Sequence, residues 1–227
     1  MIYLCITPFF PTPDHFGGPF IYDQVRAIER TKRFGRVVVL RPTNYQTKEN
    51  FYDVNGIRVH LFKTLNFPSY SFPGFFDAIN THNFFECLRR IGITPNDIEV
   101  VHAHVYPCFA HALKKKNHKI KAVMQYHGAD PFDIRLGKLN NFKWHRKIVA
   151  NYNKKWCGKM DLIIAISNKV LSNIVSFPLP SSYDIFDDYT DRLKGLENLS
   201  PAVINNSYIL NNGVDLSIFY PEVASKK

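Results

Sequence analysis

Short apolar runs alternate along this chain with longer stretches in which apolar residues recur at intervals of three and four positions. The short runs are rich in β-branched residues and predict strands at residues 2–6, 37–40, 57–62, 100–104, 122–126, 162–166 and 208–210. Several of these runs are apolar at every position, which is typical of strands buried on both faces of a parallel sheet.

The longer stretches predict helices, which fill most of the gaps between the strands. Their apolar spacing places them at residues 20–33, 75–90, 106–116, 138–156 and 168–176, and Ser167 stands where an N-cap belongs. This alternation predicts an α/β fold with a Rossmann-like, doubly wound parallel sheet and right-handed crossovers. The stretch 178–201, with its prolines, serines and acidic residues, is predicted to be an exposed excursion from the sheet.

Size and composition indicate an ordinary globular protein. With 227 residues and 45% hydrophobic content, the chain is long enough to bury a sizeable core. The N-terminus has a short apolar run, no basic lead and prolines close behind, so we expect neither a signal peptide nor a membrane span, and we expect a cytoplasmic location. The scattered cysteines form no Cys-x-x-Cys pair and are predicted to be buried, reduced thiols: Cys5, Cys87, Cys108 and Cys157.

The first candidate for chemistry is a glycine pair after the first predicted strand. In a parallel sheet, ligands bind at the carboxyl ends of the strands. Gly17 and Gly18 end a proline-rich loop there and open a helix, which leaves room and free amides for a phosphate or a sugar. The pair is equally compatible with a tight turn against the sheet. The dinucleotide-binding and P-loop glycine patterns are both absent.

Two further candidates are histidines at the ends of later strands. Alternation places His102 and His104 on one face of their strand, where a hydrogen-bonded pocket wall is favoured over a zinc site because no third ligand stands nearby. His127 follows the next strand, and Gly128 leaves space beside its ring. A neutral imidazole at that place can act as a general base or hold a hydroxyl group, and Asp130 can cap the following turn or polarise the ring.

Taken in order, these motifs resemble the N-terminal domain of GT-B glycosyltransferases, specifically the retaining family 4 group. The resemblance runs nearly from end to end of the chain. The Gly17-Gly18 loop is similar to that family's glycine loop, and its strand-end motifs resemble VVHAH at 100–104, QYHGAD at 125–130 and DLIIAIS at 161–167. The run LNNGVD at 210–215, followed by Phe219 and Pro221, resembles the passage into the second domain of that family.

The resemblance implies a division of the chain and a set of site residues. Residues 1–215 would form the acceptor-side domain, and 216–227 the start of an interdomain linker or a tail. His127 would be the catalytic residue, and Gly17 and Gly18 would approach the donor phosphates or the transferred sugar. We also expect acceptor-pocket and interdomain-turn residues, namely His104, Asp130, Phe67 and Phe72 in the pocket and Asn212 and Gly213 in the turn.

The implied activity is transfer of a sugar from a nucleotide-sugar donor to a lipid-linked or polysaccharide acceptor in cell-envelope glycan synthesis, without a cofactor or a metal. In the resembled family, the C-terminal domain binds the donor through a basic pair and a Glu-x7-Glu motif. Here no two glutamates stand eight positions apart, and no Asp-x-Asp pair is present. We therefore expect a donor-binding domain to be supplied in cis or in trans, and the chain alone to be inactive. A non-catalytic acceptor-binding subunit of a split glycosyltransferase is the alternative.

Charge and aromatic residues bear on the partners of the chain. The formal net charge is +10, with basic residues gathered at 114–121 and 135–159, and helix ends and solvated faces account for part of this. The aromatic segment 65–76 is compatible with core, a dimer contact or a lipid-facing loop. Because many relatives in the resembled family act on lipid-linked acceptors, we expect peripheral binding to the inner face of an anionic membrane. A nucleic-acid partner is not expected, since the chain carries no recognised module or separable basic arm.

Overall fold

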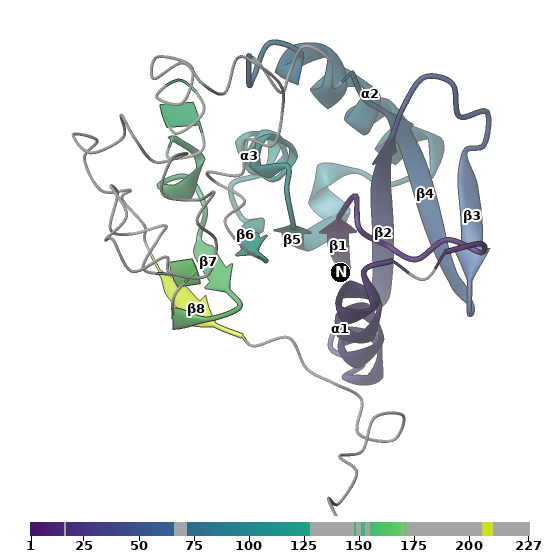
Figure 1. Ribbon diagram of the computed structural model, residues 1–227, viewed down its shortest axis with the longest axis horizontal. Helices are drawn as coiled ribbons and strands as arrows, with labels where there is room; N and C mark the ends of the chain where they lie inside the picture. The colour runs from purple at the N-terminus through teal and green to yellow at the C-terminus, as the bar shows by residue number, and fades with distance from the viewer. Residues whose placement is uncertain are drawn as a thin grey trace, which may run out of the picture.

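The computed structural model describes residues 1–15, 17–65, 72–127, 148, 151–152, 155–168, 170–171 and 206–210. These residues form one sheet with helices on both faces (Figure 1). The strands are β1 (Ile2–Ile6), β2 (Arg36–Thr43), β3 (Phe51–Val54), β4 (Ile57–Lys63), β5 (Ile98–Ala103), β6 (Lys121–Tyr126), β7 (Leu162–Ala165) and β8 (Ser207–Ile209). The helices are α1 (Pro19–Arg30), α2 (Asp77–Arg90) and α3 (Pro107–Lys116), with a 3₁₀ turn at Pro95–Asp97.

The order of the strands confirms the predicted doubly wound α/β fold. Across the sheet it is β3-β4-β2-β1-β5-β6-β7-β8, so β1 pairs in parallel with both β2 and β5. After β1, the strands β2 and β4 are added in turn on one side of it. The chain then crosses to the other side of β1, where β5, β6, β7 and β8 are added in turn. The boundary between β1 and β5 is therefore the topological switch point, where ligands bind in open sheets of this kind.

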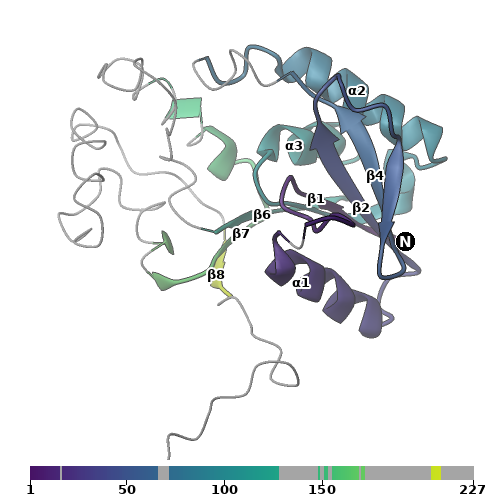
Figure 2. The same ribbon diagram turned by 45° about the vertical axis from the view of Figure 1, so that its right-hand side comes forward.

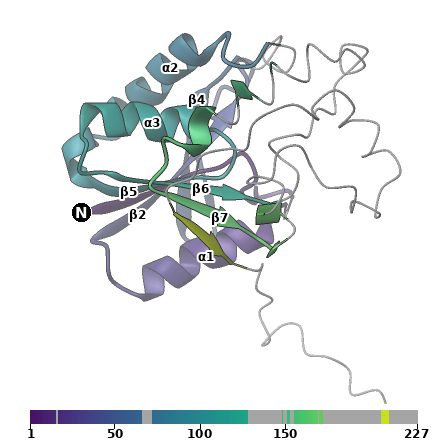
Figure 3. The ribbon, with the colours of Figure 1, turned by 90° about the vertical axis from the view of Figure 1, so that its left-hand side faces the viewer.

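Two hydrophobic cores lie on opposite faces of the sheet. Helices α2 and α3 cover one face and α1 covers the other, as Figures 2 and 3 show. In β1, Leu4 and Ile6 belong to the α2–α3 core, whereas Tyr3 and Cys5 belong to the α1 core. All five residues of β1 are buried, which is why this strand reads as a continuous apolar run.

Among the described strands, every pair is parallel except one that was not anticipated from the sequence. Strand β3 pairs antiparallel with β4 at one edge of the sheet. The two strands are joined at Asn55 and Gly56, which have φ angles of 47° and 83°. An Asn-Gly pair between apolar residues is the strongest short-range hairpin signal, so the sequence did carry the information for β3.

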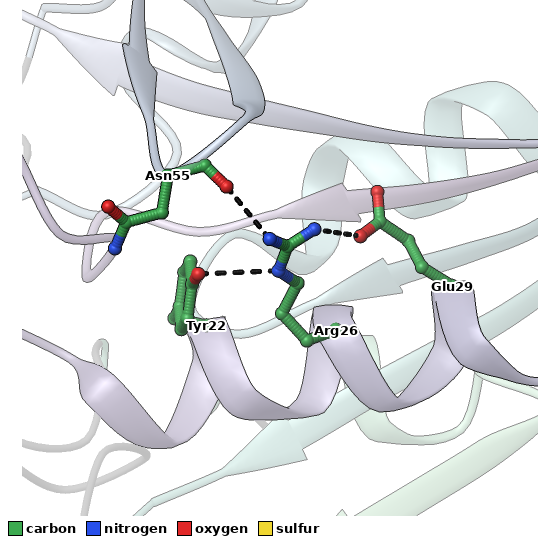
Figure 4. Close-up of polar contacts among 4 residues, drawn as sticks. All are labelled: Tyr22, Arg26, Glu29 and Asn55. Carbon is green, nitrogen blue, oxygen red and sulfur yellow. Dashed lines mark hydrogen bonds and ion pairs between the residues drawn. The ribbon is translucent and has the colours of Figure 1, made fainter.

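Helix α1 is tied to this hairpin through Arg26 (Figure 4). Its Nη2 donates to the backbone carbonyl of Asn55 at 2.8 Å, and its Nε donates to the hydroxyl of Tyr22 at 3.3 Å. Its Nη1 lies 3.1 Å from the carboxylate of Glu29, one turn further along α1. The guanidinium thus joins two turns of α1 to the turn between β3 and β4.

Several smaller predictions are confirmed. The hydroxyl of Ser167 accepts a hydrogen bond from the amide of Val170 at 3.2 Å, as expected of an N-cap. The four cysteines are buried and form no disulfide. Within the described ranges, no helix has the length and apolar character needed to cross a membrane. Most of the predicted helices at 138–156 and 168–176, the excursion 178–201 and the chain from 211 onward lie outside the described residues.

Candidate functional site

The switch point brings together three segments that are far apart in the sequence. The loop from β1 to α1 leaves the sheet at Thr7, the end of β5 leads to His104, and the end of β6 leads to His127. The ring of Phe20, in the first turn of α1, packs on the ring of His127 with centroids 4.7 Å apart. The start of α1, which follows the glycine pair, therefore lies directly against the predicted catalytic histidine.

Gly18 is required by the shape of this loop. It is the N-cap residue of α1 and has left-handed backbone angles, with φ 74°. A Cβ atom added here would lie 1.7 Å from the carbonyl oxygen of Phe9, so the loop packs too tightly for any side chain. Gly17 is less constrained, since its added Cβ would meet only the His15 ring, at 3.0 Å. The tight turn, one of the two interpretations of this pair, is thus a feature of Gly18.

A small polar network supports the loop from the outer strands. The Nε of Arg41, on β2, donates to the carbonyl of Pro8 at 3.2 Å, and its Nη1 donates to the hydroxyl of Tyr52, on β3, at 3.3 Å. The Thr7 hydroxyl accepts from the amide of Phe9 at 3.0 Å. The hairpin that the sequence analysis missed thus helps to hold the loop of the candidate site.

The histidines form a stacked column on the α1 face of the sheet. The rings of His102 and His104 lie 4.4 Å apart at an interplanar angle of 25°, and those of His104 and His127 lie 5.1 Å apart at 16°. Nδ1 of His104 and Nε2 of His127 are 2.8 Å apart and share a hydrogen bond. At the inner end, the hydroxyl of Tyr3 bonds to Nδ1 of His102. The column runs from the core under α1 to the end of the sheet.

Burial keeps the two inner histidines neutral. His102 and His104 are only 2% and 1% exposed. Burial lowers the pKa of His102 to about 3, the nearby His127 adds to this effect, and the Gln125 side chain partly opposes it. Burial, His102 and His127 lower the pKa of His104 well below its usual range. Both imidazoles are therefore uncharged at neutral pH, because a buried charge is strongly penalised.

The third histidine does not turn the pair into a metal site. The sequence analysis found no third ligand near His102 and His104, whereas the fold brings His127 beside them. The three rings are stacked nearly parallel, and a hydrogen bond joins Nδ1 of His104 to Nε2 of His127. The nitrogen lone pairs therefore do not converge on one point. Among the described residues, no group of histidine, cysteine, aspartate or glutamate side chains has an arrangement that could hold a metal ion.

Further polar residues on the same face were not singled out from the sequence. Gln24, on α1, donates from Nε2 to Oε1 of the buried Gln125, on β6, at 3.0 Å. Tyr3 is the inner end of the histidine column. Strand alternation indicates part of this arrangement. Tyr3 and Leu4 must lie on opposite faces of the sheet, and Gln125, two positions before His127, lies on the same face as His127. It did not indicate which partners these side chains would find.

The remaining predicted site residues are placed less centrally or lie outside the described residues. Phe72, which is 44% exposed, lies in the connection from β4 to α2 rather than in the histidine column. The other four cannot be located, because they fall among the residues that the structure does not describe: Phe67, Asp130, Asn212 and Gly213.

Three surface hollows in the described part of the chain lie away from the histidines. One, of about 350 Å³, lies among Arg36, Arg58 and His60, and one of about 590 Å³ lies beside Met1. Both are at the amino ends of the strands, opposite the switch point. The third, of about 500 Å³, lies between loop residues 12–15 and the turn of the β3–β4 hairpin. None of these three is lined by His104 or His127.

Comparison with known proteins identifies the family to which this architecture corresponds. The model of Glycosyltransferase Family 4 matches residues 19–183, which is most of the chain. No curated protein matches the chain.

Two solved structures are similar in fold. A sucrose-phosphate synthase from Thermosynechococcus elongatus matches with 11% identity and a TM-score of 0.53, over 97% of this chain and 50% of its own. UGT2 of Phytolacca americana, in a complex with UDP-2-fluoro-glucose and pterostilbene, matches with 10% identity and a TM-score of 0.45, over 96% of this chain and 55% of its own. The chain thus spans about half the length of the structures it matches.

Replacing Gly18 by alanine should destabilise the protein more than the same change at Gly92. Both glycines have positive φ, at 74° and 69°, which costs an alanine roughly 1–2 kcal/mol. The Gly92 Cβ would meet nothing within 4 Å, whereas the Gly18 Cβ would overlap the carbonyl of Phe9. Gly18→Ala should therefore cost a further 1–3 kcal/mol or so, measured by urea unfolding. Equal losses for the two variants would mean that the loop moves aside freely.

Acid should destabilise the protein through the buried histidines. An unfolded histidine takes up a proton as the pH falls below about 6.5, while folded His102 stays neutral until about pH 3. The unfolded state therefore binds more protons over this range, and the free energy of unfolding falls by up to about 1.4 kcal/mol per pH unit for each such histidine. When the free energy of unfolding is measured with urea at several pH values in this range, it should fall less steeply with decreasing pH for His102→Asn than for the native chain. The exposed His118→Asn is the control, and an unchanged slope in His102→Asn would contradict the prediction.

Proposed function

This chain belongs to Glycosyltransferase Family 4 and has the fold of the N-terminal domain of a GT-B glycosyltransferase, and from this premise we propose that it forms the acceptor-side half of an enzyme that transfers a sugar from a nucleotide-sugar donor. The observation that carries the proposal is the convergence of the Gly18 loop with His104 and His127 at the switch point of the sheet. Both the family and the place of the site in the fold support this reading.

The chemistry of these residues supports the proposed roles. A donor phosphate or a sugar can approach the backbone at the start of α1, where the helix dipole favours negative charge. His127 is half-buried beside this point, and its imidazole can act as a general base or hold a hydroxyl of the transferred sugar. Neither role requires a cofactor or a metal.

We place the main donor contacts in a second domain. The chain spans about half the length of the solved structures it matches, and the Glu-x7-Glu motif of the resembled family is absent from its sequence. We propose that this domain is supplied in cis or in trans, and that the acceptor is a lipid-linked or polysaccharide substrate of cell-envelope glycan synthesis at the cytoplasmic face. If the second domain is a separate chain, this one is the acceptor-binding subunit of a split enzyme.

The surface at the start of α2 supports a peripheral membrane contact. Phe75 and Ile79 are 68% and 43% exposed, and Phe72 lies beside them in the chain, with its carbonyl accepting from the amide of Phe75. Lys155 acts electrostatically on Asp77, the first residue of α2, so a basic side chain stands near these apolar ones. Each lysine near an anionic bilayer contributes about 1 kcal/mol to binding.

The proposed function is tested by sugar transfer in a complete protein, in which this chain is joined to or mixed with its donor-binding domain. His127→Ala should lower turnover by about 10²–10⁴-fold, the usual effect of losing a positioned base, with an unchanged circular dichroism spectrum. His118→Ala, at an exposed histidine after α3, is the matched control and should leave turnover unchanged.

The isolated chain provides the complementary measurement. It should bind uridine and guanosine diphosphate sugars weakly or not at all in calorimetry, and it should transfer nothing, because holding both reactants in place supplies up to about 7–11 kcal/mol of catalysis. Micromolar binding would mean that the donor site is on this chain. Measurable transfer would refute the assignment of donor binding to a second domain, and near-native turnover of His127→Ala would remove His127 from the site.

Membrane binding is tested by sedimentation with vesicles that contain anionic lipid. The native chain should bind at low salt and dissociate as salt rises, because surface charges are screened beyond about 8 Å at physiological ionic strength. Phe75→Ser should weaken binding, while Phe51→Ser, a matched change at an exposed ring on the edge strand β3, should not. If the native chain ignores these vesicles even at low salt, the exposed rings belong to another kind of contact.

A further inference from the structure

The histidine column contains one ring whose only described contacts are with other side chains of the column. His104 is 1% exposed, so it cannot itself line an open acceptor surface. Its ring stacks between those of His102 and His127, and its Nδ1 is 2.8 Å from Nε2 of His127. His127, in contrast, is only half-buried and carries the ring of Phe20 at the start of α1. His104 is thus behind the residue that meets the site.

The hydrogen bond between the two rings restricts where their protons can be. A neutral imidazole has one donor nitrogen and one acceptor nitrogen. Because His104 is neutral, only one of its two ring nitrogens carries a proton. If its Nδ1 carries that proton, Nε2 of His127 is unprotonated and accepts; if its Nδ1 is unprotonated, Nε2 of His127 carries a proton and donates. The two rings therefore carry complementary protons at the bonded nitrogens. Nε2 of His127 is engaged with His104, and Nδ1 of His127 is itself a buried atom.

The inner part of the column holds His104 in place. The Tyr3 hydroxyl keeps its proton, because burial raises its pKa, and it can donate this proton to Nδ1 of His102. The ring of His102 lies 4.4 Å from the ring of His104, and the backbone amide of His104 donates to the carbonyl of Ile6 at 3.0 Å. The His104 ring is therefore held by the stacked His102 ring and by the backbone hydrogen bond to Ile6.

We propose that His104 is a positioning residue that holds the imidazole of His127 in one orientation and one tautomer through the hydrogen bond to its Nε2. This role rests on the proposed function, because it matters only if His127 meets a sugar. It differs from the pocket-wall role predicted from the sequence, since His104 acts through His127 rather than on the acceptor. In other enzymes, a hydrogen bond to the far nitrogen of a histidine selects the nitrogen that reacts.

The proposal is tested by nuclear magnetic resonance on the native chain with ¹⁵N-labelled histidine. Long-range ¹H–¹⁵N correlations report which ring nitrogen carries the proton, and His127→Gln assigns the signals of His127. At neutral pH, we expect one tautomer for His127, the complementary state for Nδ1 of His104, and a ¹⁵N–¹⁵N coupling across the bond between them. Two exchanging tautomers of His127, or like protonation at the two bonded nitrogens, would overturn the proposal.

A pair of variants separates positioning from packing. His104→Leu keeps an apolar side chain in the column but removes the bond, and it should convert His127 to a mixture of both tautomers. The control is His60→Leu, which changes another buried histidine, on β4, and should leave the His127 signals unchanged. A single His127 tautomer in a folded His104→Leu variant would refute the role of His104. If His104→Leu does not fold, the measurement on the native chain still decides the question.

The measurement does not depend on catalysis. If the complete protein transfers no sugar but His127 has a single tautomer bonded to His104, the proposed function fails and the positioning contact stands. If transfer occurs and His127 is tautomerically mixed, the proposed function stands and the role of His104 fails.

Discussion

The parallel pairing of β1 with both β2 and β5 is the constraint on which the rest of this structure depends. A strand with hydrogen-bonded neighbours on both sides and a core on each face must be apolar throughout, and β1 is buried at every position. Because the chain leaves β1 toward one face and β5 toward the other, the loops after these strands diverge. At this place the ring of Phe20, just after the Gly18 loop, packs on His127, which is hydrogen-bonded to His104.

The two faces of the sheet are used differently. The α2–α3 face is an apolar core, in which Phe62, Phe84 and Phe109 pack together with ring centroids 5.0–5.5 Å apart. The α1 face also buries polar side chains, among them His102, His104 and Gln125. Burying such groups lowers stability unless each finds a partner. Hydrogen bonds within the column, from Tyr3 to His102 and between His104 and His127, offset part of this cost in stability.

Membership in Family 4 and the position of the histidine column at the carboxyl ends of the strands are consistent with one another. The column runs to the carboxyl ends of the strands, and it does not line any of the three hollows described above. The donor, the acceptor and the partner domain belong to the proposed function, whereas the stacked column is a feature of the structure.

The sequence alone determined the fold class and the main strands, because buried parallel strands are apolar throughout. It placed Gly18 and His127 after the ends of such strands, where we predicted the site. It also contained the Asn55-Gly56 signal for the edge hairpin, although the short strand β3 before it has no continuous apolar run. Only the tertiary structure decided that His104 lies behind His127 and that Tyr3 closes the column from inside. Those contacts join residues 23 and 99 positions apart, and one-dimensional spacing carries no information about which rings will meet across a sheet.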